Sequence, residues 1–139
     1  MINRRTIHIE WGDCDPAQIV YFPRYFEYFD ACTAALFAKV GLSKPEMLKT
    51  YGIVGFPVVE IQSRFMAPSH FSEDVVIESE IGEWGRSSFR VRHRLYNGEK
   101  LAVECVETRV WTAASAEDPE KIESKPVPRE VVALFETNP

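Results

Sequence analysis

The chain has 139 residues, of which 45% are hydrophobic, and its net charge is −5 at pH 7. This length fits one domain over residues 1–139, with enough apolar residues for a packed core. The acidic balance argues against nonspecific nucleic-acid binding, the three separated cysteines indicate neither a disulfide framework nor a metal site, and no apolar run reaches transmembrane length. We therefore expect a cytoplasmic globular protein with no metal, nucleic-acid or membrane partner.

The first predicted element is a strand over residues 4–11. Apolar and polar residues alternate along it, which predicts one buried face, formed by Ile7, Ile9 and Trp11. Gly12-Asp13 ends this strand. Asp15-Pro16 then resembles a helix N-cap followed by proline at the first helical position, which predicts a turn or a helical start.

Two helices are predicted next. The longer one begins at Pro23 and ends before Gly41, and its apolar stripe and alanines predict that much of it is buried. A shorter helix to Tyr51 is indicated by Ser43 as N-cap, with Glu at the third helical position, and by Gly52 after its last residue. A long apolar helix of this kind needs a sheet to cover it.

The rest of the chain is dominated by a period of two. Strands are predicted near residues 56–65, 75–84, 89–96 and 100–112, and Asn97-Gly98 predicts a tight hairpin between the last two. A polar loop, a short strand near 121–124 and a helix opened by Pro128 complete the chain. The predicted fold class is α+β, with a long central helix wrapped by a curved antiparallel sheet.

The stretch from Trp11 to Asp30 is the best candidate for chemistry. A carboxylate beside a helix N-terminus either caps backbone donors or faces a cleft into which those donors point. From the residues alone, capping is the stronger interpretation for both Asp13 and Asp15. A lone carboxylate with a backbone oxyanion hole would nevertheless suffice for a thioester, because a thiolate leaves readily.

The same stretch resembles the hotdog-fold acyl-CoA thioesterases, and among them the 4-hydroxybenzoyl-CoA thioesterases in particular. The first motif is long and specific: Gly12-Asp13-Cys14-Asp15-Pro16-Ala17, Ile19-Val20-Tyr21, Pro23, Tyr25 and Phe29-Asp30-Ala31. Weaker motifs follow in the same order: Gly52-Ile53-Val54-Gly55, Pro57, and Glu83-Trp84 with Ser88-Phe89. The resemblance covers nearly the whole chain.

This resemblance implies an acyl-CoA substrate, a hotdog fold, and a homodimer with interfacial active sites that often pairs into a homotetramer. The family's catalytic carboxylate corresponds to Asp15, and its carbonyl-polarising backbone N–H corresponds to Phe22. Asp30 matches an aspartate near the phenol of a hydroxybenzoyl group. The expected coenzyme A contacts are Arg86, Ser87 and Ser88. No cofactor is implied, since coenzyme A is part of the substrate.

Two departures from the family pattern limit the resemblance. Relatives often carry Tyr or His where this chain has Phe22, so only the backbone N–H can act there. The basic run that follows Glu83-Trp84 in relatives retains only Arg86, so the coenzyme A contacts are expected to differ. Two alternative functions remain: a hotdog dehydratase, which would need a catalytic His near the central helix, and a non-catalytic acyl-CoA-binding module.

Overall fold

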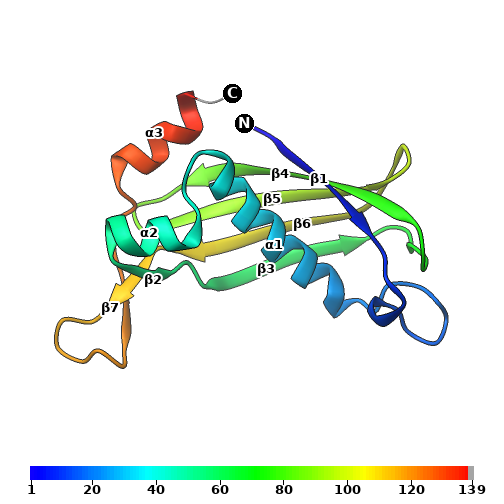
Figure 1. Cartoon of the computed structure of the whole chain (residues 1–139), viewed down its shortest axis with the longest axis horizontal. Coiled ribbons are helices and arrows are strands. Elements are labelled where there is room, and N and C mark those ends of the chain that lie inside the picture. Colours follow the sequence, from blue (N-terminus) through cyan, green and yellow to red (C-terminus); the bar gives the residue numbers. More distant parts are fainter. Residues whose placement is uncertain (138–139) are drawn as a thin grey trace.

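A computed structural model describes residues 1–137 (Figure 1). Five strands form an antiparallel sheet in the order β1-β4-β5-β6-β3. Their bounds are β1 Asn3–His8, β3 Val58–Phe65, β4 Asp74–Trp84, β5 Ser88–Asn97 and β6 Lys100–Val110. A smaller antiparallel sheet contains β2 Ile53–Gly55, β7 Thr112–Ala114 and β8 Ile122–Ser124. The helices are α1 Pro23–Lys39, α2 Lys44–Tyr51 and α3 Arg129–Thr137.

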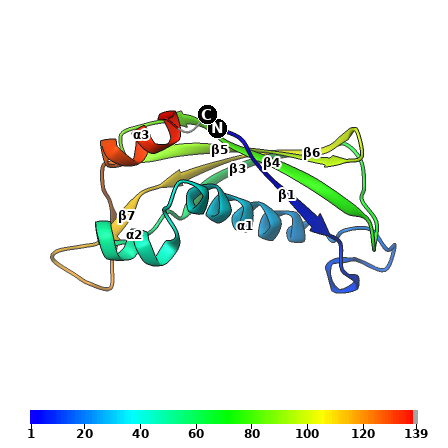
Figure 2. The same ribbon diagram turned by 45° about the horizontal axis from the view of Figure 1, so that its top comes forward.

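Helix α1 lies along one face of the five-stranded sheet, as Figure 2 shows. Its buried side chains pack against the inward residues of β4, β5 and β6, and two of them, Phe29 and Phe37, are almost completely buried. Phe37 also stacks on Phe56, with ring centroids 4.8 Å apart, and packs against the tilted ring of Phe89 at 5.4 Å. The α+β class and the long helix against an antiparallel sheet, both predicted from sequence, are confirmed.

The predicted stop and turn signals act as expected. The Ser43 side chain accepts a hydrogen bond from the Glu46 N–H at 3.4 Å at the start of α2, and Gly52 ends that helix in the left-handed conformation, with φ of 63°. Gly98 has φ of 62° in the hairpin between β5 and β6. Among the described residues, no helix has both the length and the apolar character needed to cross a membrane.

Two predicted strands differ from the structure at their ends. Trp11 was expected on the buried face of the first strand, but its side chain is 61% exposed, because a 3-10 turn over Trp11–Asp13 follows β1. The strand predicted over 100–112 is interrupted at Trp111, which is buried, and the chain continues as β7 in the smaller sheet. The short strand β2, which pairs with β7, was not predicted.

Strand β3 forms one edge of the large sheet. It pairs with β6, and no second strand pairs with it in residues 1–137. Its apolar side chains are largely exposed, with Val59 62% exposed, although the edge of a stable sheet is ordinarily short, charged or covered. The exposed apolar residues on and beside this strand are Val58, Val59, Ile61, Phe65 and Met66. Such a surface is typical of an interface with another chain.

Candidate active site

The segment between β1 and α1 folds back on itself as an irregular hairpin over residues 13–21, which we call the acidic hairpin. The Tyr21 N–H donates to the Asp13 carbonyl at 2.8 Å, and the Asp15 N–H donates to the Ile19 carbonyl at 2.9 Å. At the tip, Gln18 adopts a left-handed conformation, with φ of 65°. Asp15 therefore lies in a turn held by main-chain hydrogen bonds, and the helical start considered at Asp15-Pro16 does not form.

The two acids of the hairpin have different partners. One Asp13 carboxylate oxygen accepts the Glu10 N–H at 3.1 Å, so Asp13 caps the 3-10 turn. Asp15 Oδ1 accepts the Ala17 N–H at 2.8 Å, which orients the carboxylate within its own turn. Asp15 Oδ2 has no hydrogen-bond partner in the described part of the chain, and the residue is partly exposed. Asp15 is thus the acid with an oxygen available to a ligand.

Phe22 occupies the N-cap of α1, directly after the acidic hairpin. Its side chain is 58% exposed, and its N–H has no hydrogen-bond acceptor among residues 1–137. The next residue, Pro23, has no N–H, and the Arg24 N–H already donates to the Tyr21 carbonyl at 2.8 Å. The Phe22 N–H is therefore an available donor at the positive end of a 17-residue helix dipole.

Two neighbouring side chains are poor candidates for nucleophiles. Burial raises the pKa of the Cys14 thiol, and the charges of Asp13 and Asp15 raise it further. Burial also raises the pKa of the Tyr28 phenol, with a further contribution from Asp13. The Tyr28 hydroxyl is buried and has no geometrically acceptable hydrogen-bond partner in the described chain. Both groups are protonated at neutral pH.

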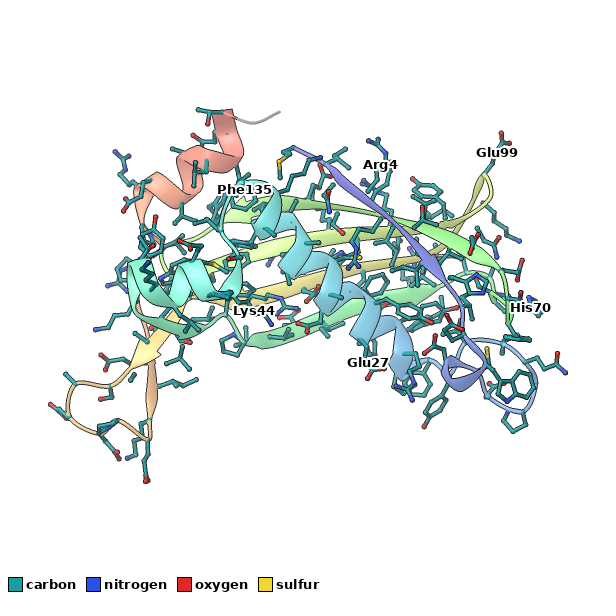
Figure 3. The ribbon with its side chains drawn as sticks, in the orientation of Figure 1. Arg4, Glu27, Lys44, His70, Glu99 and Phe135 are labelled. Carbon is teal, nitrogen blue, oxygen red and sulfur yellow. The ribbon has the colours of Figure 1, made fainter. Side chains whose placement is uncertain are left out.

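Asp30 lies on α1, eight residues after Phe22, or about 12 Å further along the helix. It lines a hollow of about 520 Å³ between α1, β3 and β6, together with Phe26, Glu27, Val58, Ile61, Glu107 and Arg109. Arg109 Nη2 donates to Asp30 Oδ1 at 2.9 Å. Figure 3 labels Glu27, which lies on the same helix.

Arg109 belongs to a buried polar network that was not predicted from the sequence. Arg109 donates to the Glu107 carboxylate, and Glu107 also accepts from Thr33 at 3.1 Å and bonds to His93. Burial raises the pKa of Glu107, but its hydrogen bond to His93 and the charges of His93 and Arg109 outweigh that effect, so the pKa lies below its ordinary value. Glu107 is therefore an ionised carboxylate inside the core.

The sequence did contain a signal for this network. In β6, inward and outward positions alternate, and Val103, Cys105, Glu107 and Arg109 share the inward face. Two charged residues at core-facing positions of a predicted strand indicate a buried ion pair, since unpaired charges are rarely buried. Their partner on α1 is 79 residues away from Arg109 in the sequence, and the strand pattern does not identify it.

The predicted coenzyme A contacts lie far from the acidic hairpin within one chain. Arg86 and Ser87 lie in the turn between β4 and β5, next to α3, and Ser88 is the first residue of β5. The Arg86 carbonyl accepts the Val127 N–H at 2.8 Å. The acidic hairpin lies at the other end of β4, where Ile19 forms a bridge with His70. Figure 3 labels His70 at that end and Phe135, on α3, at the opposite end. The 11 residues of β4 span about 35 Å.

Among the described residues, no cluster of His, Cys, Asp or Glu is arranged to bind a metal ion. Asp15 lies in the acidic hairpin, Phe22 is the N-cap of the helix that follows it, and Asp30 lies about two helical turns further along α1. The arrangement at the hairpin, a carboxylate oxygen and a backbone donor at a helix N-terminus, suits nucleophilic or general-base attack on a carbonyl.

Known proteins with similar sequences are thioesterases. The chain is 36% identical over 134 residues to the 4-hydroxybenzoyl-CoA thioesterase of Pseudomonas sp. (strain CBS-3), covering 91% of this chain and 92% of that protein. It is 28% identical over 95 residues to a 1,4-dihydroxy-2-naphthoyl-CoA hydrolase of Synechococcus elongatus, covering 68% and 70%.

Solved structures show the same relationship. A crystal structure of a 4-hydroxybenzoyl CoA thioesterase mutant complexed with 4-hydroxybenzoyl CoA matches with a TM-score of 0.89 and 30% identity, covering 96% of this chain and 98% of that one. A gentisyl-coenzyme A thioesterase matches with a TM-score of 0.81 and 27% identity, covering 96% and 99%. The family model of the thioesterase-like superfamily matches residues 9–135. The chain therefore belongs to the thioesterase-like superfamily, whose enzymes share its hotdog fold.

Proposed function

We propose that this enzyme hydrolyses an aryl or short acyl-CoA thioester, with hydroxybenzoyl-CoA as the first substrate to test. The observation that carries the proposal is the geometry of the hairpin: the unpaired Phe22 N–H follows directly on the turn in which Asp15 keeps one carboxylate oxygen available. The names of similar proteins support an acyl-CoA substrate. Coenzyme A enters as part of that substrate, and the reaction uses no separate cofactor.

In the proposed reaction, the thioester carbonyl oxygen accepts a hydrogen bond from the Phe22 N–H, and the α1 dipole stabilises the developing oxyanion. Asp15 either attacks the carbonyl carbon, forming a mixed anhydride that water then cleaves, or takes a proton from a water molecule that attacks instead. In both routes the C–S bond breaks and coenzyme A leaves as a thiolate. The thiolate takes up one proton of the consumed water and the other proton is released to solvent, so the products are a carboxylate and the coenzyme A thiol.

The proposal places the working site in a homodimer, which pairs further into a homotetramer. The unpaired edge and exposed apolar residues of β3 support a contact with a second chain. In such an assembly, Arg86 of one chain would lie close to the acidic hairpin of another. Arg86, Ser87 and Ser88 would then contact coenzyme A. We place this assembly in the cytoplasm, where its three cysteines, none of them in a disulfide, remain reduced.

The acyl group is proposed to enter the hollow beside α1, where Asp30 accepts a hydrogen bond from a ring hydroxyl. Phe26, Val58 and Ile61 supply apolar walls for an aromatic ring. The dehydratase alternative has less support, because His93 is buried and bonded to Ser79 and Glu107, and the ring of His70, beside the acidic hairpin, is bonded to Glu73.

A hydrolysis screen tests the proposal. The purified protein is mixed with benzoyl-, 4-hydroxybenzoyl-, phenylacetyl- and short aliphatic CoA esters, and release of the coenzyme A thiol is followed. We expect turnover that is fastest with an aryl ester. Hydration of an enoyl-CoA without hydrolysis would establish the dehydratase instead, and tight acyl-CoA binding without any turnover would establish the binding module.

A further inference from the structure

We infer that Arg109 is a positioning residue that makes Asp30 a selective acceptor for acyl groups carrying a hydrogen-bond donor, such as a ring hydroxyl. The inference rests on the proposed function and adds a second set of residues to it. Arg109 does not need to touch the substrate in order to act. It works by fixing one oxygen of Asp30 and leaving the other to the acyl group.

The two partners differ sharply in their environment. The Arg109 side chain is 5% exposed, whereas the Asp30 side chain is 60% exposed and lines the hollow beside α1. Their hydrogen bond of 2.9 Å uses Asp30 Oδ1, and Oδ2 has no partner in the described chain. A buried cation thus holds an exposed carboxylate at the wall of a cavity large enough for an aromatic ring.

Arg109 is itself held on several sides. Its Nε donates to Glu107 at 2.8 Å, its Nη1 donates to the Phe56 carbonyl at 3.2 Å, and its Nη2 donates to both Glu107 and Asp30. The guanidinium carbon also lies 5.7 Å from the centre of the Phe56 ring. This use of a planar, forked cation is specific to arginine, because a lysine ammonium cannot reach all of these acceptors at once.

Glu107 is fixed by the core in turn. Its Oε1 bonds to His93 and accepts from Thr33, while its Oε2 is bound by Arg109. His93 is locked from its other side by Ser79 at 2.7 Å, and Phe29 stacks on its ring at 4.9 Å. The hydrogen-bonded chain therefore runs from the middle of the sheet to the hollow without a break, so Asp30 is held by the core and not by solvent.

The chemistry of the hollow follows from these charges. Three carboxylates, those of Glu27, Asp30 and Glu107, line it beside one guanidinium, whose Nη2 donors are occupied by Asp30 and Glu107. An acyl group with a hydroxyl can donate to Asp30 Oδ2, whereas an acyl group with its own carboxylate is repelled. An unsubstituted ring leaves the acceptor without a donor. Selectivity for the hydroxylated ring is therefore the property that Arg109 controls.

The test compares kcat/KM for 4-hydroxybenzoyl-CoA with kcat/KM for benzoyl-CoA. Arg109→Lys keeps the charge but loses the fork, and we expect it to lower this ratio about tenfold or more, close to the effect of Asp30→Asn. The double variant with Arg109→Lys and Asp30→Asn should have a ratio only slightly lower than that of either single variant, because both substitutions remove the same interaction. The control is Arg4→Lys, on the far edge strand β1, where Arg4 pairs with Glu78 at 2.5 Å.

Stability is measured in parallel, since Arg109→Lys also disturbs a buried charge. If that variant does not fold, the double variant Glu107→Gln with Arg109→Met removes both buried charges and provides the same comparison of substrates. An unchanged ratio in a folded, active Arg109 variant, with a lowered ratio in Asp30→Asn, would overturn the inference. A wild-type protein that hydrolyses no acyl-CoA would instead refute the proposed function.

Discussion

The acidic hairpin and the buried network hold their carboxylates in opposite ways. Asp15 is positioned by backbone hydrogen bonds within a turn of a few residues, so its geometry depends on local sequence. Asp30 is positioned by Arg109, whose own position depends on Glu107 and through it on the packed core. The difference separates two tasks: the hairpin presents a reactive group close to the surface, and the core provides a rigid wall against which an acyl group is recognised.

The largest effect should come from the hairpin. Asp15→Asn keeps the size of the side chain and its acceptor for the Ala17 N–H, but removes the charge needed for attack or proton transfer. We expect kcat to fall by about 10²- to 10⁴-fold with little change in unfolding free energy. Thiol release under saturating acyl-CoA, with urea denaturation alongside, measures both. Full turnover in this variant would remove Asp15 from the mechanism.

In the buried network around Arg109 and Glu107, substitutions should instead produce a large change in the free energy of unfolding. Arg109→Met leaves the buried Glu107 carboxylate without its main cationic partner, so the free energy of unfolding should fall by about 3–5 kcal/mol. Replacing Glu107 by Gln in the same protein should restore much of that loss, because the remaining buried charge is removed. Chemical denaturation of both variants checks this. Equal stability of Arg109→Met and the wild type would show that the network contributes no rigidity.

The contrast also explains which features the sequence made predictable. The acidic hairpin lies within one continuous stretch, so its turn residues, its acids and the start of α1 were recognised together. Asp30 and Arg109 are 79 residues apart, and only the packing of α1 against the sheet that contains β6 brings them together. The break at Trp111 was likewise not predictable, because the Trp111 N–H donates to the Ser87 carbonyl and the Trp111 carbonyl accepts from the Lys125 N–H, both in other segments.

The pH dependence of stability should distinguish the two regions more finely. The folded-state pKa of Glu107 lies below its ordinary value of 4.5, so the folded chain binds fewer protons there than the unfolded chain. Its contribution to stability is therefore present above about pH 4.5 and is lost as the pH falls through the folded pKa. We expect Glu107→Gln to flatten the loss of stability as the pH falls below about 4.5, measured by urea midpoints. An unchanged slope would mean that other carboxylates dominate acid unfolding.

The smallest effect concerns Asp13, the acid that caps the 3-10 turn before the hairpin and is not proposed to react. Asp13→Ala removes the acceptor for the Glu10 N–H, and Ser43→Ala removes a comparable cap at the start of α2, away from the hairpin. Each should cost about 1 kcal/mol of unfolding free energy. Because the Asp13 carbonyl also anchors Tyr21, only the first variant should in addition lower kcat, as the turn carrying Asp15 loosens. If both variants lose stability and both keep full turnover, the hairpin does not need its cap to position Asp15.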